Sequence, residues 1–274
     1  MGQGENREED ANMTDVKAIV LRAAGTNCDV ETQHALELAG ARVDRVHINS
    51  LIRNLELVDA YQIFVMPGGF SYGDDVAAGK ILANQVMHHL RDALERFVEQ
   101  GKLVLGICNG FQVLVKAGLL PGATASSHTQ EGVTITYNDS DKFENRWVYL
   151  APQTDRCVFI EPGRRLYLTV GHGEGKVVAQ DPSVLSRLQS MRHIAFQYVD
   201  AQGREGGYPV NPNGSMASIA GLTDTTGRIL GLMPHPERFV HPTQHPRWTR
   251  MNGNIECDGR TIFDNAVKYV RGHF

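Results

Sequence analysis

The chain has 274 residues, of which 42% are hydrophobic and 21% charged, and its formal net charge is -4. This length predicts one or two domains whose core needs no disulfide or metal, and the composition excludes a chain that is disordered throughout. Mild acidity without a Lys/Arg-rich run argues against nucleic acid as a partner. No apolar run is long enough to span a bilayer and no signal peptide begins the chain, so we expect no membrane partner and a cytoplasmic location.

The cysteines are too far apart in the sequence for the paired spacings of zinc sites. We therefore expect free thiols and no metal on this chain. The four are Cys28, Cys108, Cys157 and Cys257.

Residues 1–16 are polar, charged and unpatterned, which predicts a disordered tail, and residues 17–274 then form a single domain. Strand-like and helical patterns alternate over the first half of this domain. Short apolar strands separated by helices pair in parallel and are covered on both faces. The fold class predicted is therefore α/β, with a doubly wound, mostly parallel sheet. The expected strands are 18–21, 43–48, 61–66 and 102–105, and the expected helices are 30–39 and 81–100.

After Pro121 the pattern changes to short β-like runs separated by turn residues. These runs predict a strand-rich antiparallel extension of the sheet or an insertion into it. A helical pattern over 262–270 closes the chain. The β-like runs are 133–137, 147–150, 157–160, 166–170 and 194–199.

The strongest local signal is an apolar run followed by Gly106-x-Cys108-x-Gly110 and a helical pattern. Glycines on both sides suit a sharp strand-to-helix turn, because side chains there would clash. The turn presents the Cys108 thiol, and the N–H groups of the next helix favour a thiolate and can hold an oxyanion. The alternative is a small buried hydrophobe at a strand end, as most single cysteines are.

A second signal is His235-Pro-Glu237, which follows the apolar run 229–233. In extended chain, residues i and i+2 point to the same side, and the proline fixes the backbone between them, so Glu237 can orient His235. The pair predicts a general base and its orienting acid for a nucleophilic Cys108. The alternative is a surface turn, as at two later His-Pro pairs that lack the acid.

A third signal is the turn Pro67-Gly68-Gly69 after a predicted strand. Its bare backbone can donate N–H groups to a developing negative oxygen, with the Asn109 amide as the second donor. An ordinary Pro-Gly turn is the alternative. The nearby run 73–80 is similar to a phosphate loop but has the wrong glycine spacing and lacks the Ser or Thr that binds magnesium, so it predicts no ATP on this chain.

Together these motifs resemble the class I (triad) glutamine amidotransferases. The order Cys108, His235, Glu237 separates the chain from α/β-hydrolases, in which the acid lies between nucleophile and histidine. Longer strings are similar to the family of glutaminase subunits of phosphoribosylformylglycinamidine synthase, from about residue 17 to the C-terminus. These strings are 24–29, 66–74, 106–112, 145–147, 171–175, 211–215 and 233–238.

The resemblance implies that Cys108 attacks the side-chain amide of glutamine, releases ammonia and leaves a thioester that water hydrolyses. Gln112, Gly68, Gly69 and the backbone of Asn109 would bind glutamine and its oxyanion. Ammonia would pass to a separate synthetase subunit that binds ATP and magnesium, so no cofactor is expected on this chain. A small accessory subunit is a further implied partner.

Two other functions share most of these features. One is a triad amidotransferase of another nucleotide or carbamoyl pathway, in which the same chemistry serves a different acceptor. The other is a catalytically silent regulatory subunit that keeps the fold for docking. The presence of all three triad residues argues against the silent subunit.

Overall fold

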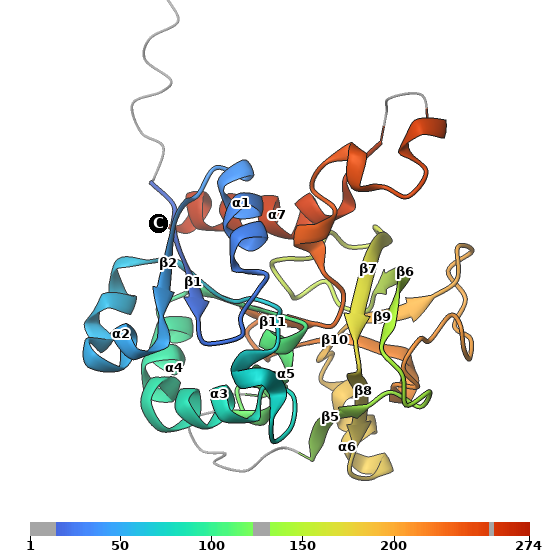
Figure 1. Ribbon diagram of the computed structural model, residues 1–274, viewed down its shortest axis with the longest axis horizontal. Helices are drawn as coiled ribbons and strands as arrows, with labels where there is room; N and C mark the ends of the chain where they lie inside the picture. The colour runs from blue at the N-terminus through green and yellow to red at the C-terminus, as the bar shows by residue number, and fades with distance from the viewer. Residues whose placement is uncertain (1–14, 123–131, 252–254) are drawn as a thin grey trace, which may run out of the picture.

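The computed structural model describes residues 15–122, 132–251 and 255–274, and its centre is a nine-stranded mixed sheet between two layers of helices (Figure 1). The strand order is β2-β1-β3-β4-β11-β10-β9-β6-β7. The five strands from β2 to β11 pair in parallel and the remaining pairs are antiparallel. The predicted α/β fold, with a mostly parallel sheet and an antiparallel extension, is confirmed.

The strands are β1 (Lys17–Arg22), β2 (Arg42–His47), β3 (Ile63–Met66), β4 (Leu103–Ile107), β5 (Val133–Tyr137), β6 (Glu144–Pro152), β7 (Leu166–His172), β8 (Glu174–Ala179), β9 (Ile194–Val199), β10 (Ile219–Thr223) and β11 (Ile229–Leu232). The helices are α1 (Asp29–Leu38), α2 (Ile48–Arg53), α3 (Lys80–Gln85), α4 (Arg91–Glu99), α5 (Asn109–Lys116), α6 (Pro182–Ser190) and α7 (Asp258–His273). Strands β5 and β8 form a separate antiparallel ribbon that packs on α5.

The central strands β3, β4 and β11 are buried along their whole length. Helices α1 and α7 cover one face of the sheet, and α3, α4 and α5 cover the other (Figure 1). Strands buried on both faces need continuous apolar runs rather than alternating ones, which is why these segments are readable from the sequence.

Some sequence predictions differ from the structure. The run 157–160 is not a strand: Cys157 and Phe159 are buried, but the backbone turns, with Val158 N bonded to Gly227 O and Ile160 N to Cys157 O. An apolar run of four residues fits a buried turn as well as a strand. The predicted helix 81–100 comprises α3, a π-helical turn (Val86–Leu90) and α4. The sequence patterns did not predict β8, β10, α2 or α6.

The predicted tail lies mostly outside the described residues. Val16, its last residue, is buried, and its carbonyl accepts a 2.7 Å hydrogen bond from Arg42 N. The folded part therefore includes at least one residue that the composition assigned to the tail. Within the described part of the chain, no helix has the length and apolar character needed to cross a bilayer.

Candidate active site

The predicted site residues lie where parallel strands end at one edge of the sheet. Strands β1, β3, β4 and β11 all run in the same direction, so their carboxyl ends meet there. The loop after β1 carries Cys28, the turn after β3 carries Gly68, Cys108 directly follows β4, and His235 follows β11. Four distant stretches of chain are thus brought to one place.

Cys108 occupies the turn between β4 and α5, with φ 50° and ψ -104°, a conformation that non-glycine residues rarely adopt. The turn is tight because α5 lies directly against the sheet. A Cβ on Gly110 would lie 1.9 Å from Met66 O, and one on Gly106 would lie 2.8 Å from Gly110 O. Both glycines are therefore required by close approach of the backbone, as the motif predicted.

His235 and Glu237 form a buried pair. The Nδ1 of His235 is 2.6 Å from Oε1 of Glu237, and each residue is 1% exposed. The backbone N–H of His235 donates to Thr169 O at 2.8 Å, which fixes the start of the motif against β7. Burial lowers the pKa of His235, but Glu237 and the neighbouring cysteines outweigh it and raise this pKa well above its usual value. The pair therefore stabilises an imidazolium.

The thiol of Cys108 lies beside this imidazole. Its sulfur is 3.7 Å from the carbonyl oxygen of Gly171, and it is one of the groups that raise the pKa of His235. Nε2 of His235 is buried and has no hydrogen-bond partner among the residues that the structure describes. With Nδ1 occupied by Glu237, Nε2 is the atom that is free to accept the thiol proton.

A backbone donor directly follows Cys108. The first helical bond of α5 runs from Gln112 N to Cys108 O, so the N–H of Asn109 precedes the helical hydrogen-bond pattern. The Asn109 side chain accepts from Ser71 N at 3.3 Å and donates to Asp74 Oδ1 at 3.2 Å. It thereby ties the turn that contains Gly68 and Gly69 to the start of α5.

Gly69 is held against the loop after β1. It adopts φ +144°, and a Cβ there would lie 2.8 Å from Asn27 N. Thr26 and Gly69 form an isolated antiparallel bridge. The turn is thus placed by backbone contacts that exclude a side chain.

Gln112 is buried on the first turn of α5, facing the loop between β7 and β8. Its Nε2 donates to the carbonyl of Glu174, and its Oε1 accepts from Asn109 Nδ2 at 2.9 Å. Both ends of the amide are engaged within the protein. A ligand that uses this side chain must replace one of these bonds.

Three residues of the site were not predicted individually. Cys28 lies beside the His235 ring, Arg238 donates to the Cys28 sulfur at 3.2 Å, and the buried His172 also lies near His235. Burial lowers the pKa of His172 to about 3. Each belongs to one of the longer strings noted in the sequence, but only the strand order shows that the strings meet.

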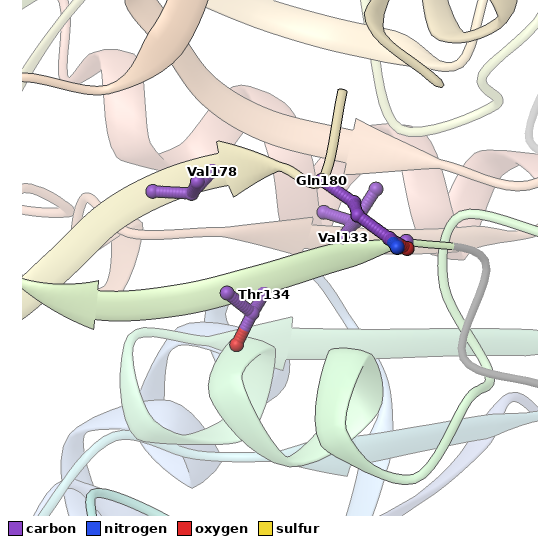
Figure 2. A pocket seen from close by; sticks show the side chains of 5 residues that line it. Val133, Thr134, Val178 and Gln180 are labelled. Carbon is purple, nitrogen blue, oxygen red and sulfur yellow. The ribbon is translucent and has the colours of Figure 1, made fainter. Parts of the chain in front are cut away.

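A shallow pocket lies elsewhere, on the β5–β8 ribbon (Figure 2). It contains none of the predicted site residues. Its lining is Gly132, Val133, Thr134, Val178 and Gln180.

Comparison with known proteins identifies the family of the chain. A family model described as a CobB/CobQ-like glutamine amidotransferase domain matches residues 15–270. The chain is 48% identical to the phosphoribosylformylglycinamidine synthase subunit PurQ of Dehalococcoides mccartyi, over 94% of this chain and 99% of that protein. It is 40% identical to the subunit of the same name from Methanococcus maripaludis, over 92% of this chain and 97% of that protein.

A solved structure agrees with these sequence matches. A chain of PurLQS from Thermotoga maritima superposes with a TM-score of 0.70 and 30% identity, covering 94% of this chain and 100% of that one. The matches extend over nearly the whole described domain rather than over the short motifs alone. The chain therefore belongs to the glutamine amidotransferase family, among the PurQ subunits of phosphoribosylformylglycinamidine synthase.

Proposed function

We propose that this chain is the glutaminase subunit of a phosphoribosylformylglycinamidine synthase and that Cys108, His235 and Glu237 carry the hydrolysis. The observation that supports this most directly is the buried His235–Glu237 pair: its Nε2 has no partner among the described residues, and the neighbouring Cys108 raises the pKa of the ring. A nucleophile, a base and an orienting acid are the three groups that acyl transfer from an amide requires.

The first step breaks the amide bond. His235 takes the Cys108 proton at Nε2, and the sulfur attacks the side-chain carbonyl carbon of glutamine. The carbonyl oxygen becomes negative and is stabilised by the N–H of Asn109 and by the backbone at Gly68 and Gly69. His235 then returns the proton to the leaving nitrogen, which departs as ammonia and leaves a glutamyl thioester on Cys108.

The second step regenerates the thiol. His235 takes a proton from water, the hydroxide attacks the thioester carbonyl, and the Cys108 sulfur leaves and is reprotonated as glutamate departs. Glu237 remains a carboxylate and stabilises the imidazolium in both steps. Gln112 would contact the bound glutamine after giving up its bond with Glu174 or Asn109.

The partner follows from the relatives. The Thermotoga maritima complex is named PurLQS, so we propose that this chain passes ammonia to a synthetase subunit and that a small third subunit joins them. ATP and magnesium would bind to the synthetase, and this chain would need no cofactor. The proposed acceptor is formylglycinamide ribonucleotide.

The test is to combine the chain with that synthetase, ATP and magnesium and to compare glutamine with ammonia as the nitrogen source. Cys108→Ser should abolish the glutamine-dependent product and leave the ammonia-dependent product unchanged, while Cys257→Ser should change neither. Glutamine-dependent activity that survives in Cys108→Ser contradicts the assigned nucleophile. A wild-type chain that releases glutamate but activates only a different synthetase contradicts the assigned acceptor.

A further inference from the structure

A second cysteine lies in the site and has no part in the mechanism above. The sulfur of Cys28, a ring nitrogen of His235 and a carboxylate oxygen of Glu237 all lie within 4.8 Å of one another, and all three residues are buried. Above Gly68 the sulfur and the imidazole face the same small space. A Cβ placed on Gly68 would be 3.3 Å from the Cys28 sulfur and 2.7 Å from Cε1 of His235.

Hydrogen bonds hold the backbone of Cys28 in place. The N–H of Cys28 donates to Gly68 O at 3.2 Å, and the carbonyl of Cys28 accepts from both N and Oγ1 of Thr32, at 3.1 and 2.6 Å. Cys28 thus joins the loop after β1 to the turn after β3 and also begins α1. These bonds fix the backbone that carries the thiol beside the imidazole.

A positively charged guanidinium contacts the same sulfur. Nη2 of Arg238 donates to Cys28 Sγ at 3.2 Å, and Nε of Arg238 is 3.9 Å from Oε1 of Glu237. Burial lowers the pKa of Arg238, but Cys28 and Glu237 outweigh burial and raise this pKa above its usual value. The guanidinium therefore stays charged. The Cys28 thiol itself donates to Oδ1 of Asn27 at 3.3 Å, so its sulfur is held from two sides.

A nucleophilic role fits Cys28 poorly. The first turn of α1 contains the carboxylates of Asp29 and Glu31, whereas the first turn of α5 contains no acid. Carboxylates at the helix start repel the oxyanion that an attack by Cys28 would create. A metal also fits poorly, because the Arg238 guanidinium already occupies the sulfur and would repel a cation.

Several other charged and titratable groups face the His235 ring. Among the residues that the structure describes, they include two thiols, Cys28 and Cys108. The groups are Cys28 after β1, Cys108 after β4, His172 at the end of β7, and Glu237 and Arg238 after β11.

We propose that Cys28 is a positioning residue for the glutaminase reaction: held by Arg238, its sulfur supports the His235 ring and stabilises the positive charge that His235 acquires from Cys108. The inference rests on the proposed function. It assigns a role to the string 24–29, which the triad leaves unexplained.

The test uses the full chain with its synthetase and follows glutaminase kcat, KM and pH profile together with the alkylation of Cys108 by an electrophilic glutamine analogue. Losing the sulfur removes a neighbour that raises the pKa of His235, so the imidazolium is lost at a lower pH. In Cys28→Ala we expect the basic limb of both profiles to move down by about half a pH unit or more. We expect kcat to fall roughly tenfold, because the ring is less well held, with KM within about twofold.

Two variants guard against a trivial loss of folding. Cys28→Ser keeps an acceptor for Arg238 and should recover part of kcat and of the pH profile. Arg238→Gln leaves the buried sulfur in place but removes its guanidinium donor, so kcat should fall as in Cys28→Ala while KM changes little. The matched control is Cys257→Ser, which replaces a thiol at the start of α7. This variant should leave the pH profile unchanged.

The inference is overturned if Cys28→Ala, or Arg238→Gln where the alanine variant does not fold, keeps the wild-type pH profile and kcat. It is also overturned if mass spectrometry places the analogue on Cys28 in the wild-type chain. Failure of the proposed function looks different, because Cys108→Ser would then retain glutaminase activity whatever happens at position 28.

Discussion

Replacing Gly68 by alanine tests how closely the turn after β3 is fitted to the catalytic histidine. The new Cβ would lie 2.7 Å from Cε1 and 3.3 Å from Nδ1 of His235. Carbon atoms in contact normally stay about 3.5–4.0 Å apart, so the ring must retreat by roughly 1 Å. The backbone of Gly68 lies outside the left-handed region, so an alanine is tolerated there apart from this contact and a 3.3 Å approach to the Cys28 sulfur.

The expected effect is on catalysis more than on stability. A displacement of about 1 Å in a catalytic group can reduce the rate about 10²-fold, which corresponds to roughly 2.7 kcal/mol in the activation barrier. We expect kcat/KM of Gly68→Ala to fall by about that factor, because the displaced His235 ring is less well placed to take the Cys108 proton.

The assay is glutamate release from glutamine with the synthetase and ATP present, and thermal unfolding shows whether the fold survives. Gly173→Ala is the matched control, because it lies between β7 and β8 close to the site and a Cβ there has no atom within 4 Å. Wild-type kcat/KM in a folded Gly68→Ala chain would show that the imidazole does not need its present position. An equal loss in Gly173→Ala would show that the effect is not specific to the His235 contact.

Three further predictions follow from the buried groups. Glu237→Gln keeps an acceptor for Nδ1 but removes the charge that stabilises the imidazolium, so kcat should fall roughly 10²–10⁴-fold in steady-state assays, and an unchanged kcat contradicts the role. His172→Gln removes a histidine whose pKa is about 3 when folded and about 6.5 when unfolded. Since the unfolded chain binds the extra proton, wild-type stability should fall by roughly 2 kcal/mol more than that of the variant between pH 6.5 and pH 5, and equal slopes in urea unfolding contradict this. Gly231→Ala places a Cβ 2.1 Å from the Phe111 ring and should lower the free energy of unfolding by about 1–3 kcal/mol, again measured in urea, where a neutral effect would contradict the packing.

The parallel half of the fold was predictable because its strands are buried on both faces. Continuous apolar runs such as β3 and β4 are visible in the sequence without knowledge of their neighbours. Strand β8 was not, because it begins with Glu174-Gly-Lys176, which are poor strand formers, and it pairs only with β5 in the separate ribbon. The run 157–160 shows the opposite case, in which apolar residues are buried without forming a strand.

The site also contains residues that local sequence predicts and one that it does not. Cys108, His235 and Glu237 are readable because each depends on local geometry: a glycine-flanked turn, or two residues on the same side of an extended segment. Cys28 is not readable as a site residue from local geometry alone. It contacts His235 only because β1 lies next to β3 and because β11 pairs with β4, and that strand order is a property of the whole sheet.

Two buried histidines meet in this site, and their surroundings leave one neutral and make the other positive. His172 bonds through Nδ1 to the amide oxygen of Asn138, an uncharged group, and burial together with the nearby His235 lowers its pKa. His235 bonds to the carboxylate of Glu237, which outweighs burial and raises its pKa. His172 therefore stays neutral near pH 7, and of the two rings His235 is the one that accepts the proton of Cys108. One acid decides which ring is charged. Replacing Glu237 should therefore lower the pKa of His235, which weakens its stabilised imidazolium and narrows the pKa difference between His235 and His172.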